Sequence, residues 1–220
     1  MKLLFVVNPI AGNGAPLEAI PLIEQYCTEH NIHYEIRKTE YKGHGTILAR
    51  NSIPLAYQGI VAVGGDGTIL EVANGLIGSP VPLGILPMGT GNDLSRALNI
   101  PSDINSALSI ITSNHPVSID AIAYENGYFF NVASIGFDAE IIRDITKVQR
   151  WVPGKAAYYI SVFLKFISYK CKKVSLKIDD ISFKSKIFLI AIANGTHYGG
   201  GMNVNPTGSL CDGYLDVILI

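Results

Sequence analysis

Three glycine-rich segments contain the residues whose types and spacing most clearly suggest chemistry. They are Asn8–Gly14, Gly64–Thr68 and Gly89–Asp93, and each follows a short apolar run and precedes a helical pattern. Glycine leaves backbone N–H groups unobstructed, and the start of a helix carries a partial positive charge, so both features suit a phosphate chain. A glycine loop can also be a plain structural turn, and that interpretation stays open for the first segment.

The second segment contains an acid, Asp66, among residues that otherwise favour anions. This arrangement makes chemical sense if a Mg2+ ion lies between the Asp66 carboxylate and the phosphates. Thr68 has an additional structural interpretation, because its hydroxyl could cap the helix that follows. The three segments together predict a phosphate-binding site that depends on magnesium.

Familiar motifs of other phosphate-binding and hydrolytic proteins are absent from the sequence. It contains neither G-x-x-x-x-G-K-[ST] nor G-x-G-x-x-G, which disfavours Walker-type, Rossmann and protein-kinase sites. It also lacks G-x-S-x-G and H-E-x-x-H, which disfavours hydrolases. His44 and His197 lie near the glycine segments, and we interpret them as hydrogen-bonded surface residues rather than ligands.

Composition limits the class of protein further. The 220 residues are 48% hydrophobic and 16% charged, with a formal net charge of −1, so a basic field for nucleic acid is missing. Three scattered cysteines suit a reducing compartment. The apolar start is too short for a secretory signal, and the longest apolar stretch, 156–169, is too short to span a bilayer. We therefore expect a cytoplasmic protein without a transmembrane segment.

The elements that must position these loops alternate through the first half of the chain. Apolar runs predict strands, and the periodic stretches between them predict helices, a pattern typical of a mainly parallel sheet. Strands are expected over 3–7, 33–37, 60–63 and 83–87. Helices are expected over 17–30, 45–51, 68–77, 93–98 and 104–112, the last capped by Ser102.

The second half of the chain has a different pattern, with strands joined by turns and few helical stretches. Strands are expected over 117–123, 128–133, 174–178, 183–193 and 215–220, with turns at Asn126-Gly127 and Asp179-Asp180. One helix, 154–170, interrupts them. The predicted fold is therefore a three-layer α/β domain over 1–118, followed over 119–220 by a mainly antiparallel, incomplete β-sandwich domain.

The chain resembles the diacylglycerol kinase catalytic family, whose fold is related to that of NAD kinases. The resemblance extends along the whole chain, and its most specific part is the segment P-L-G-I-L-P-M-G-T-G-N-D at 82–93. The other matching residues are Asn8-Pro9 with Gly12, Thr39, Gly43-His44, Gly64 to Thr68, Glu71 with Asn74-Gly75, Phe130 to Ala133, Gly136 to Asp138, Asn194-Gly195, Tyr198 to Met202 and Asp212 to Asp216.

The resemblance implies a site for ATP and Mg2+ with specific residues. Asp66 belongs to the catalytic Mg2+ network. The nucleotide contacts implied are Asn8, Pro9, Ile10, Ala11, Gly12, Thr39, Gly64, Gly65, Asp66, Gly67, Thr68, Ile69, Leu70, Glu71, Thr90 and Asn92. A second Mg2+ site is implied at Asp212 with the main-chain oxygens of Ser209 and Tyr214, where a plain Asp-Gly turn is the alternative.

Two departures from the family pattern bear on activity. Asn13 stands where many relatives carry a basic residue. The resemblance also implies a general-base Glu in a late Asp-Gly-Glu, which would lie beyond Ile220. A chain without that Glu would bind nucleotide without completing the transfer.

The resemblance implies transfer of a phosphoryl group from ATP to the hydroxyl of diacylglycerol or a related lipid at a membrane surface. The helix expected over 154–170, with Trp151 and nearby lysines, is a candidate for contact with an anionic surface, and a core or homodimer helix is the alternative. A kinase of another acceptor, a sphingoid base or NAD, and a non-catalytic nucleotide-binding module also stay open.

Overall fold

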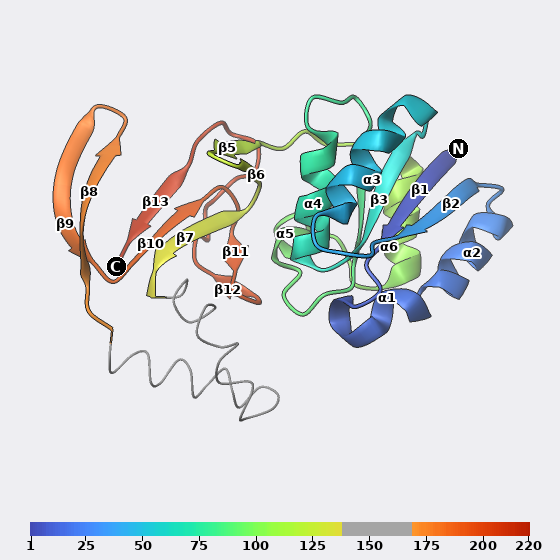
Figure 1. The fold of residues 1–220 in the computed structure, drawn as a ribbon, viewed down its shortest axis with the longest axis horizontal. Helices are drawn as coiled ribbons and strands as arrows, with labels where there is room; N and C mark the ends of the chain where they lie inside the picture. Colours follow the sequence, from blue (N-terminus) through green and yellow to red (C-terminus); the bar gives the residue numbers. More distant parts are fainter. Residues whose placement is uncertain (138–168) are drawn as a thin grey trace. The chain divides into compact units, whose positions relative to one another are not determined.

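The computed structural model describes residues 1–137 and 169–220, which belong to two compact units (Figure 1). The first unit consists of Met1–Asn131 and Gly195–Gly213, and the second of Val132–Asn194 and Tyr214–Ile220. The polypeptide therefore passes from the first unit to the second and returns once before its last strand. The domain boundary expected at residue 118 stays a prediction.

A four-stranded parallel sheet forms the centre of the first unit. Its strands are β1 (Lys2–Val7), β2 (His33–Lys38), β3 (Gly59–Gly64) and β4 (Leu83–Pro87), in the order β2-β1-β3-β4. All of the pairings are parallel. The four strands coincide with the predicted runs to within one residue at each end, because short β-branched runs bounded by turn residues are a strong strand signal.

Helices cover both faces of this sheet. They are α1 (Ala15–Glu18), α2 (Ile20–Glu29), α3 (His44–Ser52), α4 (Asp66–Leu76), α5 (Asp93–Ala97) and α6 (Ile104–Ser113), with 3-10 turns at Ala11–Gly14 and Ile53–Leu55. Leu4 and Val6 point into a core shared with α3, α4 and α5. Phe5 and Val7 point into a core shared with α2 and α6. The central strands β1 and β3 are almost entirely apolar because both of their faces are buried, whereas the edge strand β2 is largely polar and exposed. Helices on both faces of a parallel sheet confirm the three-layer α/β prediction.

Two helix predictions need correction. The helix expected over 17–30 is divided into α1 and α2, since Pro21 has no N–H to donate across the junction. The cap of α6 is Asp103 rather than Ser102: the Asp103 carboxylate accepts hydrogen bonds from the Ser106 N–H at 2.8 Å and from its hydroxyl at 2.7 Å. These bonds lower the pKa of Asp103.

Short strands complete the first unit, and antiparallel strands form the second. Hairpins β5–β6 (Ile122–Tyr124, Gly127–Phe129) and β11–β12 (His197–Tyr198, Met202–Asn203) belong to the first unit. The second unit contains the sheet β13-β10-β7 (Asp216–Leu219, Leu189–Ala193, Val132–Gly136) and the separate hairpin β8–β9 (Lys172–Ile178, Ile181–Ile187). The antiparallel pairing of this second part agrees with the prediction.

Three of the predicted strands differ from the structure. The strand expected over 117–123 is restricted to β5, because the segment before it bonds to a distant loop, with the Asp120 N–H donating to the Leu210 carbonyl at 2.7 Å. The runs over 128–133 and 183–193 are each broken in two, at Phe130-Asn131 and at Phe188. At both breaks the backbone changes pairing partner, which apolar periodicity does not encode. The expected turn at Asp179-Asp180 is confirmed.

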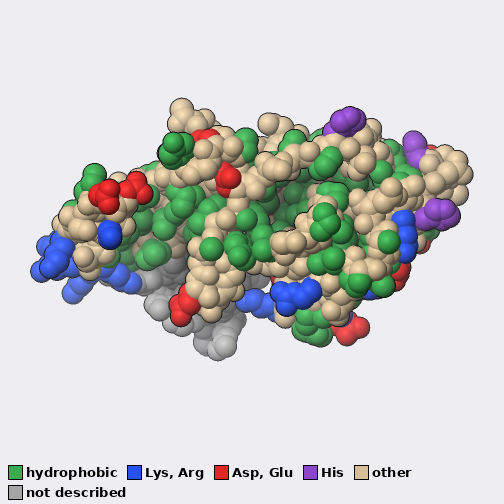
Figure 2. All heavy atoms as spheres, turned by 90° about the horizontal axis from the view of Figure 1, so that it is seen from above, with side chains coloured by type: hydrophobic (Ala, Val, Ile, Leu, Met, Phe, Trp, Pro, Cys, Tyr) green, Lys and Arg blue, Asp and Glu red, His purple; other side chains and the backbone are tan. Residues whose placement is uncertain are grey.

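An apolar cavity of about 740 Å3 opens in the first unit at the amino ends of the strands. Figure 2 shows hydrophobic side chains gathered around a hollow on this face. His115 is the one acidic or basic side chain that lines it. The cavity lies at the opposite sheet edge from the glycine loops, and its mainly apolar lining does not suit a phosphate chain, so we place the candidate site at the loops.

Two further predictions concern membrane contact. The helix expected over 154–170, together with Trp151, falls almost entirely outside the described residues, as does Asp138 of the family motif. Among the helices that the structure describes, none has the length and apolarity needed to cross a bilayer.

Candidate nucleotide-binding site

The three glycine loops meet at one edge of the parallel sheet. Val7 pairs with Val63, and Gly64 pairs with Pro87, so β1, β3 and β4 end nearly level. The backbone bonding continues past the strand ends, since the Asn8 N–H donates to the Val63 carbonyl at 3.0 Å and the Met88 N–H to the Gly64 carbonyl at 2.7 Å. Carboxyl edges of this kind are where open α/β sheets bind ligands.

Two of these loops touch through their backbones, and only glycine permits the contact. A Cβ atom added to Gly89 would lie 2.4 Å from the Gly65 Cα atom. The first loop approaches equally closely, because a Cβ atom on Gly12 would lie 2.2 Å from the Met88 carbonyl oxygen, and Gly12 has a φ of +50°. The glycines therefore set the spacing between the loops in addition to exposing their amides.

Asn8 joins the first loop to the start of α4. Its side-chain amide donates to the Thr68 hydroxyl at 2.9 Å, and its side-chain oxygen accepts from the Ile10 N–H at 3.2 Å. The Ala11 N–H donates to the Asn8 carbonyl at 3.3 Å. Thr68 is thus a partner of Asn8, and the expectation that it caps α4 is wrong, because the capping position is Gly65 and lacks a side-chain bond.

Asp66 is the first residue of α4, where the helix dipole favours a negative group. One carboxylate oxygen, Oδ1, accepts a hydrogen bond from the Leu94 N–H of α5 at 3.3 Å. The other, Oδ2, faces Gly91, where an added Cβ atom would lie only 2.9 Å away. The carboxylate therefore lies between the second and third loops and is held by the start of α5.

Asp93, the last residue of the third glycine segment, is a site residue that was not among the predicted contacts. Its carboxylate accepts hydrogen bonds from the Gly200 N–H at 2.9 Å and the Gly201 N–H at 2.7 Å. Its Oδ2 atom also lies near Gly91, 3.3 Å from the position of the same added Cβ atom that Asp66 approaches. The glycine turn between β11 and β12 is thereby fixed beside the third loop. Its presence in the 82–93 motif was the signal that could have identified it.

Asn92, within the third loop, and Arg96, on α5, both stabilise that loop. The Asn92 side chain accepts from the Gly89 N–H at 2.8 Å and donates to the Gly89 carbonyl at 3.0 Å. Arg96 donates from Nε to the Gly91 carbonyl at 3.1 Å. Thr90, between the two glycines, is exposed. The loop therefore has a defined shape with one hydroxyl side chain facing solvent.

Glu71 holds the loop that follows β2. Its two carboxylate oxygens accept from the Gly43 N–H at 2.8 Å and the Gly45 N–H at 3.1 Å, at the start of α3. Thr39 begins the same loop and donates from its N–H to the Val7 carbonyl at 2.9 Å. Glu71 thus satisfies two N–H groups that a helix start leaves without a partner inside the helix, and it brings the Thr39 loop to the same sheet edge.

The remaining predicted contacts on α4 differ in exposure. Ile69 is buried in the core, so its side chain faces away from the loops, whereas Gly67 and Leu70 are exposed. His44 is half-buried, and its Nδ1 atom accepts from the Glu40 N–H at 3.1 Å while its ring stacks on Tyr41. This agrees with the interpretation of His44 as a hydrogen-bonded residue.

The residues at the loops fit a magnesium ion that is bound by one protein carboxylate, with its other ligands from phosphates and water. Within residues 1–137 and 169–220, no group of three or more acidic, histidine or cysteine side chains is placed to enclose a metal. Mg2+ commonly binds through one or two carboxylates, substrate phosphates and waters. The Asp66 carboxylate beside the loops suits that mode, because a caged site is not required.

The second predicted metal site stays a prediction. Ser209 and Asp212 belong to the first unit and Tyr214 to the second. The turn that contains Asp212 is held by Asp120, whose carboxylate accepts from the Gly213 N–H at 2.8 Å. Asp120 was not among the predicted site residues, and its position beside this turn follows from tertiary structure.

A parallel sheet with glycine loops at its carboxyl edge, followed in sequence by antiparallel sheets, defines an NAD kinase-like fold. The profile of the diacylglycerol kinase catalytic domain matches residues 2–124, and that of the YegS C-terminal NAD kinase beta sandwich-like domain matches residues 131–220. The protein belongs to the diacylglycerol kinase family, as its sequence resemblance predicted.

Individual relatives agree with this assignment. The chain is 30% identical to the diacylglycerol kinase of Staphylococcus saprophyticus over 217 residues, which cover 98% of this chain and 71% of the relative. It is 33% identical to that of Staphylococcus epidermidis, covering 98% and 69%. A crystal structure of a diacylglycerol kinase from Bacillus anthracis superposes with a TM-score of 0.74 at 29% identity, over 100% of this chain and 73% of the other.

Proposed function

We propose that this protein is an ATP- and Mg2+-dependent lipid kinase that transfers the γ-phosphate to the hydroxyl of diacylglycerol or a related lipid. Membership of a family of lipid kinases supports the reaction class. The observation that carries the nucleotide assignment is the placement of the Asp66 carboxylate between the second and third glycine loops. An isolated acid there would repel a triphosphate, so its position favours a bridging cation.

The described residues would contribute mainly positioning and charge stabilisation. Phosphoryl transfer needs the donor and acceptor oxygens in line and the developing charge neutralised, with little covalent chemistry from the protein. Amides of the Gly64–Thr68 loop at the start of α4 suit the phosphate oxygens. Asn8, through Thr68, and Glu71, through Gly43, keep the neighbouring loops in register with that helix start.

Magnesium would supply the charge that offsets the phosphates when it is bound. Asp66 would hold the ion through the carboxylate oxygen that faces Gly91, while its other oxygen stays with the Leu94 N–H. Asp93 would act as a positioning residue, because both of its oxygens already accept from the glycine turn. We place the activity in the cytoplasm, with peripheral access to lipid at a membrane.

One assay tests the proposal against its alternatives. Residues 1–220, and a form that includes the general-base Glu expected beyond Ile220, are each incubated with γ-labelled ATP, with and without Mg2+, and with diacylglycerol, sphingosine, undecaprenol or NAD. Magnesium-dependent label in diacylglycerol is expected from the form that includes the Glu. Label in another acceptor would support a different kinase on the same scaffold, and binding of ATP by that form without any transfer would support a nucleotide-binding regulatory module.

A further inference from the structure

The hairpin β8–β9 in the second unit is strongly amphipathic. In an antiparallel pair, residues directly opposite each other share a face. Lys173 faces Lys186, Ser175 faces Lys184, and Lys177 faces Ser182. One face is therefore made of four lysines and two serines, which we call the lysine face: Lys173, Ser175, Lys177, Ser182, Lys184 and Lys186.

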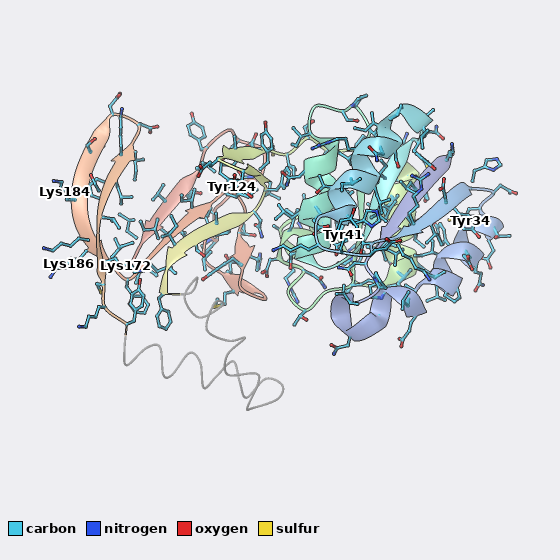
Figure 3. All side chains as sticks on the ribbon, viewed as in Figure 1. Tyr34, Tyr41, Tyr124, Lys172, Lys184 and Lys186 are labelled. Atoms are coloured by element: carbon cyan, nitrogen blue, oxygen red, sulfur yellow. The ribbon has the colours of Figure 1, made fainter. Side chains whose placement is uncertain are left out.

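The opposite face of the hairpin is mainly apolar and partly covered. It contains Val174, Leu176, Ile178 and Phe183, which are half-buried, and Ile187, which is only 2% exposed. Lys172 and Ile181, at the two ends of this face, are exposed, and Ser185 lies opposite Val174. All six residues of the lysine face are exposed. The hairpin thus packs through one face and presents the other to solvent. Figure 3 shows Lys184 and Lys186 extending from β9, and Figure 2 shows lysines gathered over this hairpin.

The charges on the lysine face are uncompensated within it. None of its four lysines forms an ion pair with a described residue. The acids of the hairpin, Asp179 and Asp180, lie at the turn and outside the face. Lys173 and Lys186 are directly opposed, and such a like-charge pair destabilises a hairpin. This arrangement becomes favourable when a negatively charged surface lies against it.

We propose that the lysine face is a docking surface for a membrane that contains anionic lipids, an inference that rests on the proposed lipid kinase function. Four exposed ammonium groups on one face of the hairpin complement a layer of anionic headgroups, to which each basic residue adds about fivefold in affinity. The substrate class selects this partner over nucleic acid, because a lipid kinase must meet its acceptor at a bilayer. The face would orient the enzyme on the surface that contains its substrate.

Lysines on exposed strands have another use, since they prevent edge-to-edge aggregation. That role needs charge at the strand edges and predicts no preference for anionic over neutral bilayers. The two explanations therefore differ in a measurable way.

The test measures binding to vesicles of phosphatidylcholine alone and of phosphatidylcholine with phosphatidylglycerol, by co-sedimentation without ATP. Replacing Lys173, Lys177, Lys184 and Lys186 with Gln should lower binding to the anionic vesicles at least ~10-fold. Replacing the same four with Arg should preserve it, because the charge is kept. The double variant Lys42→Gln/Arg50→Gln, which removes exposed cations from the first unit, should bind like wild type.

Several results would overturn the inference. These are unchanged anionic binding by the Gln variant, equal binding of wild type to neutral and anionic vesicles, or tighter binding of wild type to a single-stranded oligonucleotide than to anionic vesicles at the same salt. Transfer of phosphate to a short-chain diacylglycerol in neutral detergent micelles is measured in parallel. That assay needs no anionic surface. If the kinase function fails, transfer in micelles is absent whatever the vesicle binding, and if only the docking surface fails, transfer in micelles is present but the preference for anionic vesicles is not.

Discussion

The Glu71 carboxylate accepts a hydrogen bond from the Gly43 N–H at 2.8 Å and thereby ties helix α4 to the loop that follows β2. The same carboxylate accepts from the Gly45 N–H at 3.1 Å, and Gly75 lets the two helices pack closely, since an added Cβ atom would lie 2.7 Å from the Ala49 Cβ atom. Glu71 was predicted as a nucleotide contact, and its observed bonds make it a residue that positions another loop.

Glu71→Ala should destabilise the protein by about 1–3 kcal/mol, because two backbone N–H groups at the start of α3 lose their acceptors. Urea unfolding followed by circular dichroism measures this. Glu71→Gln retains one acceptor oxygen, so its free energy of unfolding should lie between those of wild type and Glu71→Ala. Glu18→Ala removes an exposed acid from α1 and should change stability by less than about 0.5 kcal/mol. Equal stability of Glu71→Ala and Glu18→Ala would contradict this role.

Asp66→Asn should lower turnover by at least ~100-fold, the scale of removing one electrostatic stabiliser. The amide oxygen of Asn can still accept from the Leu94 N–H, so the fold should be preserved while the charge for magnesium is lost. Steady-state kinetics across a magnesium titration, together with the melting temperature, separate the two effects. Turnover within a few-fold of wild type would show that Asp66 does not organise the metal.

Gly89→Ala should cost about 1–3 kcal/mol, the usual penalty for overpacking, because its Cβ atom would collide with the Gly65 backbone. Gly67→Ala is the matched control in the same region. An added Cβ atom there meets nothing within 4 Å, and Gly67 lies in α4. Alanine should stabilise that position by up to about 1 kcal/mol. Thermal unfolding should show a lower melting temperature for Gly89→Ala and a higher one for Gly67→Ala. A higher melting temperature for Gly89→Ala would be evidence against the close backbone contact.

Cys27 should be the slowest of the three thiols to react. Cys27 lies on the buried face of α2, and this burial raises its pKa to about 11, whereas Cys171 and Cys211 are exposed. Alkylation at pH 8 followed by peptide mapping should therefore label two thiols quickly and Cys27 only after unfolding. Because the unfolded thiol ionises near pH 8.5, the stability contributed by Cys27 should decline as pH rises from about 8.5 to about 11. Rapid labelling of Cys27 in the native protein would be inconsistent with this burial.

Much of this protein was predictable from local sequence. The four parallel strands and the loops after them follow from apolar runs and glycine segments, since strand propensity and turn chemistry act over a few residues. The family resemblance added the roles expected of Asp66, Glu71 and Thr39. The central strands β1 and β3 are the clearest case, because both of their faces are buried and their residues are therefore almost all apolar.

Tertiary structure alone decided which partner each group takes. Asp93 binds the amides of Gly200 and Gly201 more than a hundred residues away. The strands split at Phe188 because the chain changes sheets there, and the lysine face exists because β8 and β9 pair in one register. Periodicity shows which side chains share a face of one strand, but hydrogen bonds between distant segments depend on how the whole chain closes.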